Sequence, residues 1–144
     1  MILVVDSNIL FASLIKDSTT RKIIVESEWE FYYPEMSFHE IRKYKDLVLE
    51  KSGMNEEEYT ELLGHLLKHI TLVPEEQIEG KIEEANEILG KVDPDDVVFL
   101  ATALSIENAN IWSNDPHFEK QNKVRVFKTE HIVKLFFPED VSSS

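Results

Sequence analysis

The stretch MILVVDSNILFASLI, residues 1–15, decides the fold class. Residues 2–5 form an all-apolar run that is too short for a buried helix and is typical of a strand covered on both faces. Asp6, Ser7 and Asn8 then lead into the helical pattern of residues 9–15. A buried strand that opens directly into a helix predicts an α/β fold.

The rest of the chain alternates helical patterns with short apolar runs. We expect strands over residues 30–34, 71–73, 109–112 and 124–127, and helices over residues 20–27, 38–51, 56–70, 74–90, 94–108 and 129–137. Asn55 and Thr129 are expected to cap helices, and Gly90 to end one. Short strands separated by helices favour a parallel sheet with right-handed crossovers.

Length and composition predict one folded domain over residues 1–137, followed by a frayed tail at 138–144. The apolar fraction of 42% is too high for a disordered chain, and the sequence contains no cysteine, which excludes disulfides and thiolate metal sites. No stretch has the length of a membrane span, and the first apolar run is too short for a signal peptide. We therefore expect a cytoplasmic protein.

The net charge of −13 argues against a protein that binds nucleic acid through an overall positive charge. Any contact with a phosphate backbone must therefore be local, with bound cations as one source of help. Arg42, Lys43 and Lys45 form a compact basic group, for which an exposed helix face and a phosphate contact are the two readings.

Four acids far apart in the sequence are predicted to converge. Asp6 and Asp115 each follow a strand, and Glu40 and Asp96 each lie in the first turn of a helix, so all four belong to the carboxyl edge of a parallel sheet. Clustered carboxylates repel one another unless a cation lies among them, and oxygen ligands suit Mg²⁺ or Mn²⁺. Three flanking residues could position water or ligand: Asn8, Ser113 and Asn114.

These residues resemble the four acidic motifs of the PIN-domain ribonucleases. The matching segments are VVDSNIL with Asp6, SFHEI with Glu40, DPDDVVFLATAL with Asp96 and IWSND with Asp115, in the order and spacing of the family. The resemblance covers nearly the whole chain. His117 departs from the family, whose members often carry another acid two residues after the fourth.

The resemblance implies a three-layer α/β/α sandwich with a central parallel sheet, and an endoribonuclease that depends on Mg²⁺ or Mn²⁺. Small single-domain relatives are often toxins of toxin-antitoxin pairs, held inactive by an antitoxin protein and often homodimeric. Asp96 matches the family's third acid because it directly precedes the run VVFLATA, whereas Asp93 and Asp95 are candidate auxiliaries.

Other interpretations of these residues stay open at the level of sequence. Ser37 and Glu40 have the spacing of a capping box, which would explain Glu40 without any metal. An Asp after the first strand also marks phosphotransferases, in which Asp6 would be a covalent nucleophile. A third alternative is a catalytically inactive PIN-like module that binds a partner.

Overall fold

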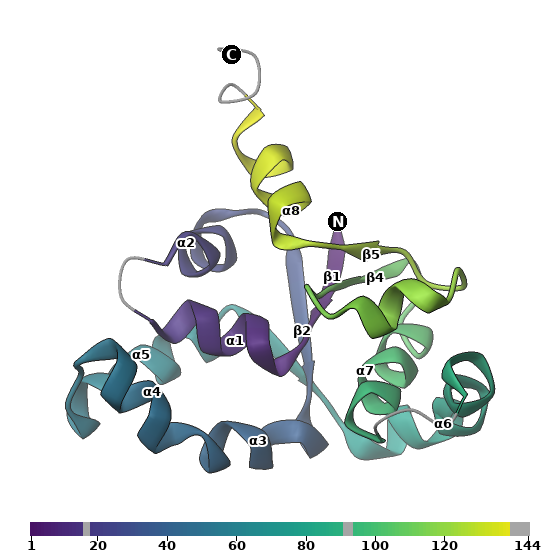
Figure 1. The fold of residues 1–144 in the computed structure, drawn as a ribbon, viewed down its shortest axis with the longest axis horizontal. Coiled ribbons are helices and arrows are strands. Elements are labelled where there is room, and N and C mark those ends of the chain that lie inside the picture. The colour runs from purple at the N-terminus through teal and green to yellow at the C-terminus, as the bar shows by residue number, and fades with distance from the viewer. Residues whose placement is uncertain (16–17, 91–93, 139–144) are drawn as a thin grey trace.

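The computed structural model describes residues 1–15, 18–90 and 94–138. At its centre is a five-stranded sheet of order β3-β2-β1-β4-β5, in which every neighbouring pair is parallel (Figure 1). The strands are β1 (Ile2–Val5), β2 (Glu30–Pro34), β3 (Ile70–Val73), β4 (Ala109–Trp112) and β5 (Val126–Phe127). The predicted parallel α/β fold is therefore confirmed.

Helices cover both faces of this sheet, which confirms the predicted three-layer sandwich. In Figure 1, helices α1 to α5 lie to the left of β1 and β2, and α6 and α7 lie to the right. The α-helices are α1 (Ser7–Leu14), α2 (Thr19–Glu26), α3 (Phe38–Lys43), α4 (Lys45–Ser52), α5 (Glu56–Leu67), α6 (Glu75–Leu89), α7 (Pro94–Leu104) and α8 (Thr129–Phe136). Two 3₁₀ helices follow β2 and β4: η1 (Glu35–Ser37) and η2 (Pro116–Lys120).

The middle of the sheet is the core of the molecule. Leu3, Val4 and Val5 of β1 have no exposed surface: α7 packs against β1 and β2, and α1 lies on the other side of the sheet (Figure 1). Trp112 at the end of β4 is equally buried, and its Nε1 donates a hydrogen bond to Thr129 Oγ1 at 3.0 Å. Within the described residues, no helix is long and apolar enough to cross a membrane.

Several helix ends follow the local sequence. Asn55 caps α5 in a capping box with Glu58, and Gly90, with a φ of 72°, ends α6. The expected cap at Thr129 is wrong, since α8 has no side-chain cap. The Thr129 hydroxyl instead accepts hydrogen bonds from Trp112 and Asn114, which fasten α8 to the end of β4.

The prediction of a single helix over residues 38–51 is also wrong. This segment forms two helices, α3 and α4, which are divided at Tyr44. The Tyr44 ring packs edge-on against Phe11 of α1, with ring centroids 5.5 Å apart. This tertiary contact has no signal in the periodicity of the sequence. The break separates the helix that carries Glu40 from the one that carries Lys51.

The strand order fixes where a functional site can form. The chain builds β1, β2 and β3 toward one edge and then returns to place β4 and β5 on the other side of β1. Val5 pairs with Trp112, so the residues that follow these two strands emerge side by side. In an open α/β sheet, such a switch point is where ligands bind, beyond the carboxyl ends of the strands.

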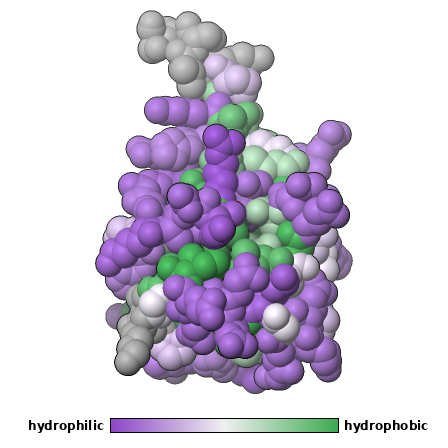
Figure 2. All heavy atoms as spheres, turned by 90° about the vertical axis from the view of Figure 1, so that its right-hand side faces the viewer, coloured by the Kyte–Doolittle hydropathy of each residue, from purple (hydrophilic) through white to green (hydrophobic). Residues whose placement is uncertain are grey.

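The face that includes α6 is mainly hydrophilic, with a limited hydrophobic area at its centre (Figure 2). Helix α6 exposes six glutamates to solvent: Glu75, Glu76, Glu79, Glu83, Glu84 and Glu87. Negative charge on this scale repels phosphate groups. The switch point of the sheet, rather than this face, is therefore the better candidate for a site that binds phosphate groups.

Candidate functional site

Asp6 lies at the junction of β1 and α1 and is only 6% exposed. Its Oδ1 accepts a hydrogen bond from the Ile9 N–H at 3.0 Å, and its Oδ2 accepts one from the Ser113 hydroxyl. Burial raises the pKa of Asp6 to about 6, and the charges of Asp115 and Asp96 add to the rise, whereas the two hydrogen bonds oppose it. The two hydrogen bonds thus fix the orientation of the carboxylate, whereas burial makes its ionised form less favourable in free energy.

The turn after β4 supplies the second acid. The backbone N–H of Asp115 donates to Ser113 Oγ at 3.0 Å, which holds Asp115 beside Asp6. Asn114 is directed to α8, where its Nδ2 donates to Thr129 Oγ1 at 3.0 Å and its Oδ1 accepts from the Thr129 N–H at 2.8 Å. Ser113 and Asp115 therefore join the site, whereas the contacts of Asn114 are structural.

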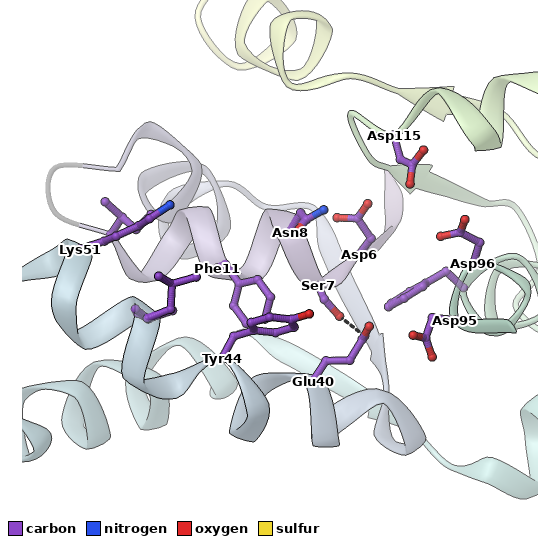
Figure 3. A pocket seen from close by; sticks show the side chains of 14 residues that line it. Asp6, Ser7, Asn8, Phe11, Glu40, Tyr44, Lys51, Asp95, Asp96 and Asp115 are labelled. Carbon is purple, nitrogen blue, oxygen red and sulfur yellow. Dashed lines mark hydrogen bonds between the residues drawn. The ribbon is translucent and has the colours of Figure 1, made fainter. Parts of the chain in front are cut away.

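The first turn of α7 contributes Asp95 and Asp96, where the positive end of the helix dipole favours carboxylates. The two side chains diverge in Figure 3, where Asp96 lies toward Asp115 and Asp95 toward Glu40. The charge of Asp95 and its hydrogen bond to Glu40 help to raise the pKa of Glu40. Asp93, a predicted auxiliary, lies outside the described residues.

Glu40 is held by a chain of hydroxyl groups. The Ser7 hydroxyl donates to Glu40 Oε2, Ser7 Oγ lies 2.7 Å from the Tyr33 hydroxyl, and that hydroxyl donates to the Ser37 carbonyl at 3.0 Å. Burial is the main cause of the raised pKa of Glu40, and the Ser7 hydrogen bond opposes it. Ser37 makes no side-chain capping bond, so the capping-box interpretation of Glu40 is wrong and Glu40 faces the cleft.

His117 lies against the acids, at the start of η2. Its Nδ1 is 2.9 Å from Asp96 Oδ2 and 3.5 Å from Asp115 Oδ1, and its backbone N–H donates to Asp115 Oδ1 at 2.9 Å. Ligand atoms of Asp96, Asp115 and His117 all lie within 4.8 Å of one another. Sequence reasoning noted His117 only as a departure from the family pattern.

All these acids open into one cleft of about 490 Å³. Figure 3 shows that the carboxylates gather at one end, whereas Phe11, Tyr44 and Lys51 lie along the other. The cleft is lined by Asp6, Ser7, Asn8, Phe11, Ile15, Glu40, Tyr44, Leu47, Val48, Lys51, Asp95, Asp96, Phe99 and Asp115. The four predicted acids and Asn8 therefore share one cavity.

Sequence reasoning missed the second end of the cleft, here called the aromatic arm: Phe11, Tyr44, Leu47 and Lys51. The arm forms where α4 packs against α1. The sequence pattern of neither helix predicts this contact. The basic group at 42–45 takes other contacts: Lys45 lies 3.5 Å from Glu56, and Arg42 and Lys43 lie over the rings of Phe38 and Tyr44.

The donor set fits a hard divalent cation. Five carboxylates line the cleft, and Lys51 is the only lysine or arginine among its described lining residues. The raised pKa of Asp6 shows that the buried charge lacks full compensation from the protein. A cation bound by Asp6, Asp96 and Asp115 would remove the mutual repulsion that contributes to that rise.

Comparisons with known proteins extend these observations. The family model described as PIN domain matches residues 4–136, a range that contains all five carboxylates. The crystal structure of VapBC2 from Rickettsia felis bound to a DNA fragment from their promoter contains a chain of similar fold, with a TM-score of 0.65. The similarity covers 89% of this chain and 98% of that chain at 14% sequence identity. No match was found among curated proteins.

Proposed function

Because this chain belongs to the PIN domain family, we propose that it is a metal-dependent endoribonuclease that hydrolyses RNA phosphodiester bonds. The observation that carries the proposal is the convergence of Asp6, Glu40, Asp96 and Asp115 in one cleft at the switch point of the sheet. In open α/β sheets, ligands bind at this edge, which supports a catalytic role for the residues that meet there.

We propose that Asp6, Asp96 and Asp115 hold Mg²⁺ or Mn²⁺, with Glu40 on the opposite side of the cleft. A bound divalent cation supplies an activated water and neutralises charge that develops on the phosphodiester. The protein's part is to orient the carboxylates. Ser113 and the Ile9 N–H fix Asp6, and Ser7 fixes Glu40, so neither acid has to reorganise when substrate binds.

Single-stranded RNA is the substrate class that best suits the cleft. Bases of an unpaired strand stack on aromatic rings, and Tyr44, 38% exposed, presents such a ring in the same cleft as the acids. Lys51 lies in the same arm and can contact a phosphate. With a net charge of −13, the protein depends on such local contacts to retain a polyanion.

A more specific proposal is that the nuclease is the toxin of a toxin-antitoxin pair. The similar chain belongs to VapBC2, whose complex was solved on promoter DNA, and the two chains have nearly the same extent. We propose that an antitoxin protein is the partner of this chain and that a homodimer forms. Isolation of the chain together with the product of a neighbouring reading frame would support this role.

A second candidate function is a partner-binding module whose acids have lost catalysis. The net charge of −13 and the imidazole in place of an acid at position 117 favour it, whereas the intact set of carboxylates counts against it. A phosphotransferase is disfavoured, because the PIN domain family, whose model matches residues 4–136, is a family of nucleases.

Cleavage assays with purified protein test the proposal. We expect a single-stranded RNA to be cut with Mn²⁺ or Mg²⁺, and cleavage to be lost in Asp6→Asn and Asp96→Asn with the fold retained. Glu79→Gln on α6 is the matched control, because it also removes one carboxylate but lies outside the cleft. Calorimetric titration of Mn²⁺ into the same proteins reports metal binding without reference to activity.

The two candidate functions give different results in these assays. Saturable Mn²⁺ binding that Asp6→Asn abolishes, together with cleavage, supports the nuclease. An intact fold with neither metal binding nor cleavage supports the partner-binding module. Cleavage that survives unchanged in both Asp variants would reject the assigned site.

A further inference from the structure

His117 is the one nitrogen ligand among the described side chains that cluster at the acids. We propose that the His117 imidazole is itself a metal ligand, and that it makes the centre select first-row transition ions over Mg²⁺. This inference rests on the proposed metal-dependent function but concerns which ions the site accepts. It requires that Nδ1 be held in place and be directed at the same point as the carboxylates.

The geometry meets the first requirement. His117 directly follows Pro116, whose ring fixes its own φ, and the backbone N–H of His117 donates to Asp115 Oδ1 at 2.9 Å. Asp115 is the N-cap of η2, and this bond is its capping bond. Asp115 therefore holds the backbone of His117 in place. The rest of η2 is secured by Phe118, which is fully buried.

Ligand convergence meets the second requirement. Nδ1 lies 2.9 Å from Asp96 Oδ2 and 3.5 Å from Asp115 Oδ1, and one ligand atom from each of the three residues fits within 4.8 Å. Both distances from Nδ1 are below about 4.2 Å, the largest separation of two ligand atoms that each lie about 2.1 Å from one ion, so Nδ1 is close enough to either carboxylate to share an ion with it.

Ligand chemistry then decides the selectivity. Carboxylate and water oxygens suit Mg²⁺, whereas imidazole nitrogen favours ions later in the first transition row, in an order that rises from Mn²⁺ through Co²⁺ to Ni²⁺. Mg²⁺ prefers near-ideal octahedral oxygen coordination and dehydrates reluctantly. A site that combines the carboxylates of Asp6, Asp96 and Asp115 with one imidazole should therefore bind Mn²⁺, Co²⁺ and Ni²⁺ more tightly than Mg²⁺.

Calorimetric titrations of Mg²⁺, Mn²⁺ and Ni²⁺ into the full chain test this inference without measuring activity. We expect His117→Asn to weaken Ni²⁺ binding by about tenfold or more, and to change Mg²⁺ binding far less. His117→Asp, which supplies a carboxylate at the same position, should narrow the preference for Ni²⁺ over Mg²⁺. His131→Asn is the matched control, since His131 is an exposed histidine on α8.

A spectroscopic signature gives an independent readout. Electron spin-echo spectra of the Mn²⁺ complex should contain coupling to a directly bonded imidazole nitrogen in the wild type and in His131→Asn, and should lack it in His117→Asn. Equal Ni²⁺ affinity and an unchanged nitrogen signal in His117→Asn would overturn the inference while the metal-dependent function stands. Absence of any saturable divalent ion in the wild type would overturn both.

Discussion

The Ser113 hydroxyl donates a hydrogen bond to Oδ2 of Asp6, and this bond joins the ends of β1 and β4. Ser113 is fully buried, so solvent cannot replace it as a donor. The same oxygen of Ser113 accepts the backbone N–H of Asp115, which links the two acids through one side chain. Each acid therefore depends on Ser113 for its place in the cleft.

Ser113→Ala should raise the pKa of Asp6 further above about 6, because one of the two hydrogen bonds that lower it is lost. It should also weaken Mn²⁺ binding, and cost about 1–3 kcal/mol in the free energy of unfolding, since a buried acceptor loses its donor. Carboxyl NMR titration of the chelator-treated protein measures the pKa. An unchanged Asp6 pKa would show that the bond is not formed in solution, and Ser52→Ala controls for loss of a hydroxyl elsewhere.

The metal-free protein should lose stability as pH rises from about 4 to 7. The pKa of Asp6 is about 6 in the folded state against 3.8 as the model value, so its contribution is fully present below 3.8 and is lost as pH rises through 6. The loss is on the order of 3 kcal/mol, from 1.36 kcal/mol for each pKa unit. Urea unfolding in chelator across this pH range measures it.

Asp6→Asn isolates that contribution, because an amide does not ionise and can still cap α1. We expect the variant to be more stable than the wild type at pH 7 without metal, with the difference disappearing near pH 4. Saturating Mn²⁺ should stabilise the wild type and leave the variant almost unchanged. Glu83→Gln on α6 is the control, and equal pH profiles for wild type and Asp6→Asn would contradict the expectation.

The Ser7 and Tyr33 hydroxyls should act as one unit that positions Glu40. In a double-mutant cycle of Ser7→Ala and Tyr33→Phe, we expect a coupling of about 1 kcal/mol in the free energy of unfolding, because the two oxygens lie 2.7 Å apart in a buried site. Ser7→Ala should lower kcat while leaving KM nearly constant, and Ser7→Thr, which retains a hydroxyl, should restore much of it. Additive effects would mean that the chain of hydroxyls is not coupled.

Tyr44→Ala should raise KM for RNA by about tenfold while changing kcat little, since stacking of one base contributes about 1–3 kcal/mol. Tyr44→Phe should behave like the wild type, because the ring rather than the hydroxyl supplies the stacking surface. Steady-state kinetics on a short single-stranded RNA separate the two constants. Leu135→Ala, at an exposed position on α8, is the control, and a fall in kcat with an unchanged KM for Tyr44→Ala would contradict a substrate-binding role.

The order of strands and helices could be predicted from sequence because each element has a local cause. The all-apolar run of β1, the capping box at Asn55 and the stop at Gly90 all act within a few residues of themselves. Where the expectation failed, a distant contact was responsible. Tyr44 divides a predicted helix where its ring meets Phe11, and Thr129 bonds Trp112 instead of capping α8.

The sequence by itself determined that Asp6, Asp96 and Asp115 would meet, because a parallel sheet brings strand ends and helix starts to one edge. Only the tertiary structure decided what surrounds them. Ser7 turned Glu40 into the cleft, η2 placed His117 against Asp96, and α4 crossed α1 to form the aromatic arm. Such contacts join residues far apart in the chain, and their formation depends on packing that no local pattern encodes.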